Sequence, residues 1–336
     1  MYTFSEQKSE LNTTQVTALG KRFENLRSVA ELAGLLGTTE PLLSRQMARP
    51  VYYTFYIPKP GGQKRLIQHP APALKIVQQS LNRYLQAMYY GVKPDCAYGF
   101  ILSPSDELRP RNIYSNALAH LKGEWFLLFD LKDFFHTVTL THLRDLFRNV
   151  LFFPPELCNA LCQLCAYQGR LPMGAPTSPV LSNLCCLFFD YQLERLAAGA
   201  QAVYTRYADD LTFSFRSEPP SGFADEVRMV VLRHGFAVNE SKVRLQSRPE
   251  QPEITGLVLG KNALPVPGKN WLKSLKQEIK IYTWLMSEAV RERGLFHAWV
   301  FDRFRRSVQG QIEFLGFILG KDHREYRKLA GKVRWG

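Results

Sequence analysis

The chain has 336 residues, of which 46% are hydrophobic, so it can bury a sizeable core and form more than one lobe. Its 43 Lys and Arg outnumber 30 Asp and Glu, giving a formal net charge of +13 that favours a polyanionic partner. The N-terminus lacks a signal-peptide pattern, and no apolar run approaches the roughly 18 residues that span a bilayer. We therefore expect a soluble, cytoplasmic protein without membrane association, and nucleic acid as the anionic partner.

The first predicted elements are helices and a hairpin. Residues 1–50 are charged and mostly helical in pattern, which predicts an N-terminal helical extension. In VYYTFYIPKPGGQKRLIQHP, two strand-like runs flank the turn signal PKPGG. This stretch predicts a β-hairpin with a basic tip formed by Lys59, Lys64 and Arg65. Taken alone, such a tip is more typical of an ordinary solvated hairpin, because charged tips are common on surface turns.

The middle of the chain predicts two helices, a buried strand and a capped turn. Helical patterns cover residues 71–90 and resume near Asn116. The segment EWFLLFD is an apolar strand that ends at Asp130, and its two apolar faces imply a buried sheet. The segment LPMGAPTSPVLSNL predicts a turn into a helix, with Ser178 as its N-cap and Pro179 at its first position.

Three cysteines raise the alternative of an iron–sulfur site. Cys158, Cys162 and Cys165 have the CxxxCxxC spacing of iron–sulfur radical enzymes. These intervals place them along one face of a helix beside leucines, and no glycine-rich loop is present to hold a cluster. Because free cysteine behaves as a small buried hydrophobe, we predict core positions for all three, and likewise for Cys185 and Cys186. Disulfides are not expected in a cytosolic chain.

The segment VYTRYADDLTFSF has the two-residue period of paired strands, yet it carries Asp209 and Asp210 near its bend. Adjacent carboxylates repel each other and resist leaving water, so a nearby cation is expected. If a sheet brings them to Asp130, the three acids match a two-metal site for Mg²⁺, with Mn²⁺ as an alternative. Sequence spacing does not prove that they meet, and Asp-Asp pairs are common in turns.

The rest of the chain predicts a basic helical end. An amphipathic helix is expected over GFADEVRMVVLRHGF, strands over FAVNESKVRL and EITGLVLGKNALPV, and helices from Trp271 onward. One helix carries a cationic stripe of lysines at steps of four, three and four: Lys269, Lys273, Lys276 and Lys280. A phosphate backbone suits this stripe, although a solvated helix face looks the same. Further basic residues follow: Arg303, Arg305, Arg306, Arg324, Arg327, Lys328, Lys332 and Arg334.

Six segments occur in the order seen in reverse transcriptases: RLIQHP, FDLKDFF, LPMGAPTSP, YADD, GFAVNESK and ITGLVLG. The ordered series is far more specific than any single motif. The chain therefore resembles this family, which implies an α/β (α+β) right-hand polymerase with fingers, palm and helical thumb. On this resemblance we expect an extension over residues 1–50, interleaved fingers and palm over 51–260, and a basic thumb that binds RNA or duplex over 261–336.

The resemblance also implies roles for acidic residues. Asp130, Asp209 and Asp210 match the catalytic metal ligands of the palm, with the Leu131 carbonyl as a further ligand, for two Mg²⁺ ions. The backbone at Asp133 matches the family's triphosphate-binding amides.

Other residues match the family's nucleotide site. Phe134 is included in that site, and Phe135 matches the bulky gate that collides with a 2′-hydroxyl, so dNTPs are the implied substrates. Three cations match those near the triphosphate or the leaving pyrophosphate: Lys64, Arg65 and Lys242. Met173 stands where the family usually has a Gln that touches the incoming sugar. Because methionine can supply only packing there, we expect altered fidelity or nucleotide affinity without loss of activity.

Two segments resemble retron reverse transcriptases more narrowly. NALAH, ending at His120, is similar to their NAxxH motif, and ITG, beginning at Ile254, is similar to their VTG. Asn116 and His120 are therefore expected nucleic-acid contacts, and Tyr207 of YADD is a further expected contact. Without this context, Asn116 is a helix-surface amide and His120 a satisfied core or surface histidine.

The retron resemblance implies a structured non-coding RNA as template, a 2′-OH primer, a branched DNA product and an effector protein in phage defence. A different bacterial defence or intron-type reverse transcriptase, with another primer, is the nearest alternative. An inactive RNA-binding scaffold is a further alternative, which the presence of all three acids disfavours.

Overall fold

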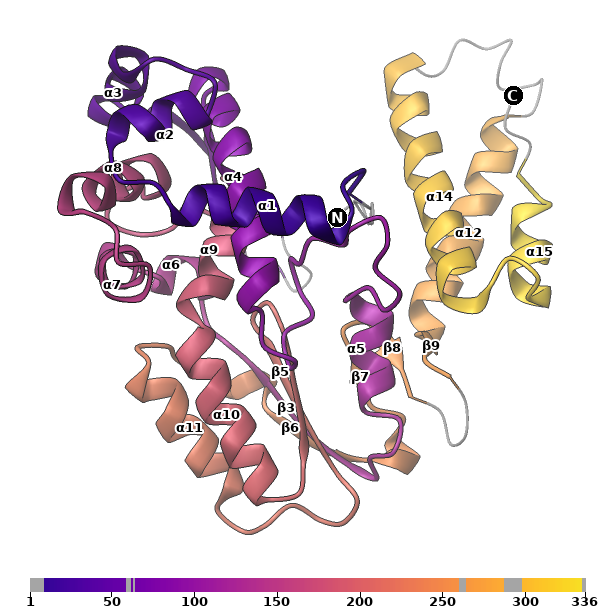
Figure 1. Cartoon of the computed structure of the whole chain (residues 1–336). Coiled ribbons are helices and arrows are strands. Elements are labelled where there is room, and N and C mark those ends of the chain that lie inside the picture. Colours follow the sequence, from indigo (N-terminus) through magenta and orange to yellow (C-terminus); the bar gives the residue numbers. More distant parts are fainter. Residues whose placement is uncertain (1–8, 59–61, 63, 260–263, 287–297, 334–336) are drawn as a thin grey trace. The chain divides into compact units, whose positions relative to one another are not determined.

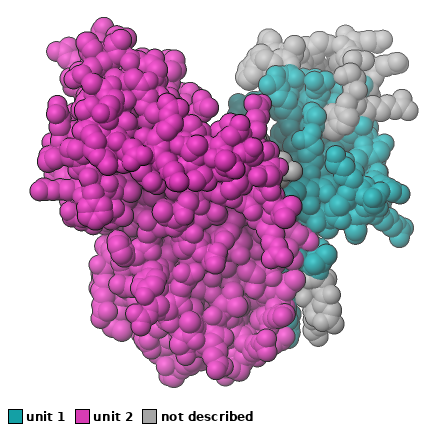
Figure 2. Space-filling view, in the orientation of Figure 1, with its two compact units in different colours: residues 1–6, 246–336 teal, residues 7–245 magenta. Residues whose placement is uncertain are grey.

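The computed structural model describes residues 9–58, 62, 64–259, 264–286 and 298–333. Contacts divide the chain into two compact units, which lie within residues 7–245 and residues 246–336 and are coloured separately in Figure 2. This division falls before residue 261, where the thumb was expected to begin. The assignment of residues 1–50, 51–260 and 261–336 to extension, fingers with palm, and thumb stays a prediction.

The N-terminal segment forms three helices: α1 (Thr13–Glu24), α2 (Val29–Leu35) and α3 (Glu40–Ala48). Helix α1 begins in a capping box, in which the Asn12 side chain accepts from the Gln15 amide and the Gln15 side chain accepts in return. It packs along α4 (Pro72–Val92), as Figure 1 shows. Apolar residues of all three helices belong to the same core as the central sheet, so this part of the chain shares one hydrophobic interior with it.

The expected hairpin is confirmed. Strand β1 (Tyr52–Pro58) pairs antiparallel with β2 (Lys64–Pro70), with Pro58 opposite Lys64 at the tip. Lys59 lies outside the described residues.

A four-stranded sheet in the order β4-β5-β3-β6 forms the centre of the larger unit: β3 (Trp125–Asp130), β4 (Val203–Tyr207), β5 (Asp210–Phe215) and β6 (Arg244–Ser247). Helices α10 (Leu187–Gly199) and α11 (Phe223–Arg233) pack together beside it, and α10 contacts β4. Helix α5 (Ile113–Ala119) also contacts β4. The apolar side chains of β3 are mostly buried, in agreement with the predicted buried sheet.

Helices next to the sheet complete the core: α6 (Phe134–Thr137), α7 (Leu140–Asp145), the π-helical turn Leu146–Val150, α8 (Pro155–Cys165) and α9 (Ser178–Cys185). Cys158, Cys162 and Cys165 are buried on α8, as predicted for core residues. The expected cap of α9 is wrong by one residue. Thr177 is the N-cap, and the Ser178 hydroxyl donates instead to the Pro172 carbonyl at 2.7 Å, inside the turn.

The strand expected over FAVNESKVRL is only partly present. A 3-10 turn, Glu240–Lys242, occupies its middle, and β6 begins at Arg244. The reason is that the chain crosses the end of β3 here, where the Asn239 amide donates to the Asp130 carbonyl at 2.8 Å. The segment EITGLVLGKNALPV forms short antiparallel strands, as predicted: β7 (Glu253–Ile254), β8 (Leu257–Val258) and β9 (Val266–Pro267).

The second unit contains β7 to β9 and the predicted C-terminal helices: α12 (Lys269–Leu285), α14 (Ala298–Leu319) and α15 (Arg324–Ala330). The helices enclose a separate apolar core that includes Leu275, Ile279 and Leu315. The four lysines of the stripe are exposed. Arg334 lies outside the described residues. None of the helices in the described ranges is long and apolar enough to cross a membrane.

Candidate active site

The pairing of β3 with β5 brings two of the three predicted acids together. Asp130 is the last residue of β3, Asp210 is the first of β5, and the register places them directly opposite each other. Residues opposite each other in an antiparallel pair have Cβ atoms roughly 4.5–5.5 Å apart. Asp209 lies in the two-residue turn between β4 and β5, and its carbonyl accepts from the Leu131 amide at 2.9 Å. The hairpin therefore carries both of its acids to the end of β3.

Burial and mutual repulsion raise the pKa values of the two hairpin acids. Burial raises the pKa of Asp210 to about 7, and the charges of Asp209 and Asp130 add to this rise. Burial also raises the pKa of Asp209, with a further contribution from Asp130. The three carboxylates therefore form one electrostatic group, in which negative charge exceeds what the site neutralises.

Positively charged side chains lie near these carboxylates, as we predicted from the adjacent acids. The Lys242 ammonium lies 2.6 Å from Asp130 Oδ2, although most of the lysine side chain is exposed. Arg65, on β2, also lowers the pKa of Asp209 through its charge, although this is a minor contribution. Lys242 therefore contacts the acids directly, whereas Lys64 lies at the exposed end of β2.

A residue that the sequence did not single out also holds Asp130. Asn239 donates from its side chain to Asp130 Oδ1 at 3.0 Å and from its backbone to the Asp130 carbonyl. Its position three residues before Lys242, in NESK, was the only signal in the sequence. Asn239 therefore fixes the orientation of the Asp130 carboxylate.

The carboxylates are chemically suitable ligands for a divalent cation, but their side chains do not surround a metal position in this structure. In the described part of the chain, no three His, Cys, Asp or Glu side chains are arranged around a metal position. Asn239 and Lys242 each engage one Asp130 oxygen, so a cation shared with the hairpin acids would compete with the Lys242 ammonium for Asp130. Carboxylate oxygens are the ligands that Mg²⁺ prefers, and such an ion would favour the charged form of Asp210 and so lower its raised pKa. The residues therefore fit a divalent metal that competes with Lys242 for Asp130.

The predicted nucleotide residues divide into two groups. Asp133 is exposed and has a positive φ of 47°, which turns the chain from the end of β3 into α6. The Phe134 ring instead stacks on Phe236 in the core, at 5.7 Å between centroids, so any nucleotide contact of Phe134 is limited to its backbone. The Phe135 ring lies 5.9 Å from Phe100.

Phe100 also lies 6.4 Å from the ring of Tyr207, so the predicted gate and the first residue of YADD flank the same aromatic ring.

The loop with Met173 is fixed against the fingers hairpin. The Gln68 amide of β2 donates to the Met173 carbonyl at 2.7 Å. Gly174 has a φ of 120°, and a Cβ there would lie 3.0 Å from the Ile67 side chain. The Met173 side chain is half-buried and packs against the main core, so its effect on nucleotide affinity stays a prediction.

The structure corrects the expected nucleic-acid contacts of Asn116 and His120. Both are buried, and His120 is completely inaccessible. Its two ring nitrogens form 2.7 Å hydrogen bonds with the hydroxyls of Ser214 and Thr205, on β5 and β4. Burial lowers the pKa of His120 to about 3, so the ring is neutral at physiological pH. The side chain of His120 joins α5 to the palm sheet and does not reach solvent.

Comparison with protein families identifies the family of the chain. The family described as reverse transcriptase (RNA-dependent DNA polymerase) matches residues 57–319, more than three quarters of the chain. The chain belongs to the reverse transcriptase family. The predicted fold class, a right-hand polymerase of mixed helices and sheets, is confirmed.

Relatives of this reverse transcriptase include retron enzymes. It is 28% identical to the retron Ec86 reverse transcriptase of Escherichia coli, over 83% of this chain and 79% of that protein. It is 33% identical to the retron Mx162 reverse transcriptase of Myxococcus xanthus, over 63% of this chain but only about half (48%) of that protein. The resemblance to retron reverse transcriptases is therefore confirmed.

Among solved structures, a telomerase from Candida albicans in complex with a fragment of telomeric RNA covers 86% of this chain and 64% of its own. It has a TM-score of 0.46 at 12% identity, which is a distant likeness.

The thumb lysines of this reverse transcriptase are not equivalent. Lys276 forms a 2.5 Å ion pair with Glu325 of α15, within the same unit. Lys269, Lys273 and Lys280 are exposed on the same helix. Their contact with nucleic acid stays a prediction.

We expect Asp210→Asn to stabilise the metal-free protein at pH 8 more than at pH 5. Because the pKa of Asp210 rises from 3.8 to about 7 on folding, the folded state retains a proton that the unfolded chain releases between these values. Stability therefore falls as pH rises through this window, and the neutral amide removes that loss. Thermal unfolding with a chelator at both pH values measures the effect; an equal shift at pH 5 and pH 8 would contradict it.

We expect His120→Ala to destabilise the protein without weakening RNA binding by the folded chain. The substitution leaves the Ser214 and Thr205 hydroxyls unpaired in the interior, at a cost of about 1–3 kcal/mol for each such group. Urea unfolding measures the loss, and RNA binding is measured under conditions in which the variant is folded. Unchanged stability together with lost RNA binding would restore a nucleic-acid role for His120.

Proposed function

We propose that this protein is the RNA-directed DNA polymerase of a retron. It copies part of a structured non-coding RNA into branched single-stranded DNA (msDNA), starts from a 2′-OH primer, and acts in antiphage defence with an effector protein. The retron relatives and the NALAH and ITG segments support this proposal. The observation that carries the catalytic part is the β3–β5 register, which sets Asp130 opposite Asp210 with Asp209 in the adjoining turn.

Asp130, Asp209 and Asp210 would hold two divalent ions, Mg²⁺ or Mn²⁺, with the Leu131 carbonyl as a further ligand. When bound, such ions lower the pKa of the attacking hydroxyl and stabilise charge on the leaving pyrophosphate. Asp209 and Asp210 are partly buried, and this partial burial strengthens the electrostatic interactions that they would make with a bound ion. Asn239 orients the Asp130 carboxylate for this task.

Lys242 serves two states of the site in this proposal. In the present structure its ammonium neutralises Asp130, and when divalent ions take over that carboxylate it becomes available to the triphosphate. Arg65, and Lys64 at the tip of the hairpin, supply positive charge from the fingers. Phe135 excludes a 2′-hydroxyl and selects dNTPs.

The basic thumb supplies sequence-independent affinity for RNA and for the product duplex. Lys269, Lys273 and Lys280 present exposed ammonium groups along one helix, and each phosphate contact releases counterions from the nucleic acid. Tyr207, at the end of β4, is the proposed contact from the palm.

We expect the double variant Asp209→Ala/Asp210→Ala to lose dNTP incorporation and to retain RNA binding, because it removes the acids while leaving the thumb lysines intact. Primer extension on an RNA template measures the first property, and filter binding measures the second. Asp225→Ala, an exposed acid on α11, is the matched control and should behave as wild type. Undiminished incorporation by the double variant would refute the catalytic assignment.

We expect nucleic acid that co-purifies with the full chain to contain RNA joined to DNA through a 2′–5′ linkage. Sequencing, with and without a debranching treatment, tests this expectation and separates the retron from its nearest alternative. DNA linked to protein, or DNA without a template, would instead indicate a defence or intron-type enzyme with a different primer.

A further inference from the structure

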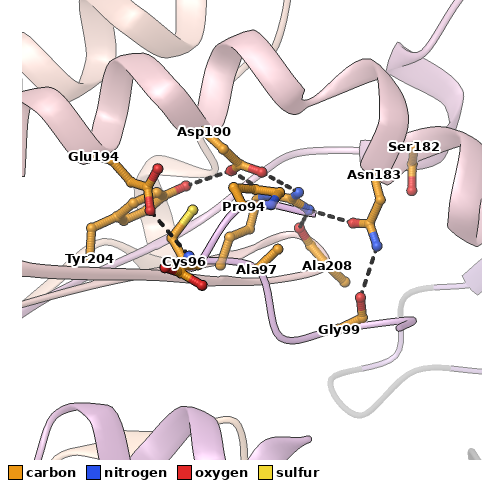
Figure 3. A network of polar contacts seen from close by, with 12 residues as sticks. Pro94, Cys96, Ala97, Gly99, Ser182, Asn183, Asp190, Glu194, Tyr204 and Ala208 are labelled. Carbon is orange, nitrogen blue, oxygen red and sulfur yellow. Dashed lines mark hydrogen bonds and ion pairs between the residues drawn. The ribbon is translucent and has the colours of Figure 1, made fainter. Parts of the chain in front are cut away.

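A buried ion pair lies directly behind the hairpin that carries the catalytic acids. Arg206, one residue before Tyr207, has only 1% of its side chain exposed. Its Nε and Nη2 donate to the two carboxylate oxygens of Asp190 on α10, at 2.7 and 2.6 Å. Asp190 is completely buried and accepts a further hydrogen bond from the Tyr204 hydroxyl at 3.1 Å. Figure 3 shows the polar network that joins Asp190 of α10 to Tyr204 and its neighbours on β4.

The third nitrogen of the guanidinium, Nη1, donates toward the hairpin turn. Arg206 Nη1 donates to the Asn183 side-chain oxygen at 2.9 Å and to the Ala208 carbonyl at 3.3 Å. Ala208 immediately precedes Asp209 and has a positive φ of 57°. This left-handed conformation is unfavourable for alanine, so surrounding contacts must maintain it.

A second segment, around Gly99, packs on the same turn. The Asn183 amide donates to the Gly99 carbonyl at 2.9 Å. A Cβ on Gly99 would lie 2.8 Å from the Ala208 nitrogen, which means that this segment packs tightly on the turn. The Tyr98 amide and the Cys96 carbonyl bond to the backbone of Arg206 at 2.9 and 2.8 Å. Asn183 therefore links the guanidinium to the segment that abuts Ala208.

Stability alone does not explain a fully buried ion pair. Removing two charges from water is costly, and well-packed apolar residues of similar volume are often as stabilising or more so. What an apolar pair cannot do is donate in several fixed directions at once. The guanidinium does so here, because it spans Asp190, Asn183 and the Ala208 carbonyl.

We propose that Arg206, Asp190 and Asn183 are positioning residues that fix the backbone at Ala208 and thereby limit where Asp209 and Asp210 lie relative to Asp130, on which the binding of divalent ions depends. This inference rests on the metal-binding role in the proposed function. The three residues act through the turn and do not touch the substrate.

The test is Mn²⁺ binding to the full chain, measured from the electron paramagnetic resonance signal of free Mn²⁺. Arg206→Lys keeps the charge but not the planar set of donors, and Asn183→Ala leaves the Arg206–Asp190 pair intact. We expect both variants to bind Mn²⁺ about 10- to 100-fold more weakly, the usual effect of losing a residue that orients metal ligands. They should also need correspondingly more Mn²⁺ for dNTP incorporation, with a smaller change in RNA affinity.

Leu193→Ala is the matched control for simple destabilisation. Leu193 is completely buried on α10, three residues after Asp190, and is not part of the polar network. We expect it to lower the unfolding temperature at least as much as Asn183→Ala does, with Mn²⁺ binding unchanged. Equal loss of Mn²⁺ binding in Leu193→Ala, or wild-type binding in Arg206→Lys and Asn183→Ala, would overturn the positioning role. If Arg206→Lys does not fold, Asn183→Ala decides between these outcomes.

The double variant Asp209→Ala/Asp210→Ala separates this inference from the proposed function. Loss of Mn²⁺ binding in that variant shows that the probe reports the site. With that loss established, wild-type binding by Asn183→Ala overturns the positioning role alone. Undiminished Mn²⁺ binding by the double variant would refute the metal site itself, and the positioning role with it.

Discussion

The antiparallel pairing of β3 with β5 is the constraint on which the rest of the site depends. It sets the Asp130 and Asp210 carboxylates opposite each other at the end of a largely buried sheet, where like charges are least tolerated. The properties of several neighbouring residues follow from this arrangement. The pKa of Asp210 rises to about 7, Lys242 lies on Asp130, and Asn239 takes its other oxygen. A bound cation would reduce this repulsion between the carboxylates and thereby stabilise the site.

Two polar clusters fix the strands that bear these acids. His120 forms hydrogen bonds with the hydroxyls of Thr205 and Ser214. Arg206, which follows Thr205 in β4, is paired with Asp190 of α10. Since successive residues of a strand point to opposite faces, the two clusters hold the sheet from both sides. Satisfied polar groups in a core favour one arrangement over near alternatives, because any shift leaves a donor or acceptor unpaired.

Two of the elements expected to bind the nucleotide are joined to each other by a backbone contact. The hydrogen bond from the Gln68 amide to the Met173 carbonyl ties the fingers hairpin to the loop before α9. Backbone contacts tolerate side-chain change at the same position, which explains how methionine can stand where the family usually has glutamine. The exposed lysines of α12, by contrast, belong to a unit with an apolar core of its own.

The sequence by itself predicted most of the elements and singled out Asp130, Asp209 and Asp210. Period-two and helical patterns predicted the fingers hairpin, the strand that ends at Asp130 and the helix with the buried cysteines. The order of six motifs predicted the family. These features are local, or depend on order along the chain, so they can be read without coordinates.

Only the tertiary structure decided how individual polar residues are used. Lys242 and Asn239 reach Asp130 across 112 and 109 residues, and His120 finds its partners 85 and 94 residues away. Sequence spacing carries no information about such distant contacts, so His120 was misread as a nucleic-acid contact and Arg206 was overlooked. Whether a polar side chain faces solvent, a ligand or a buried partner depends on the packing of distant segments.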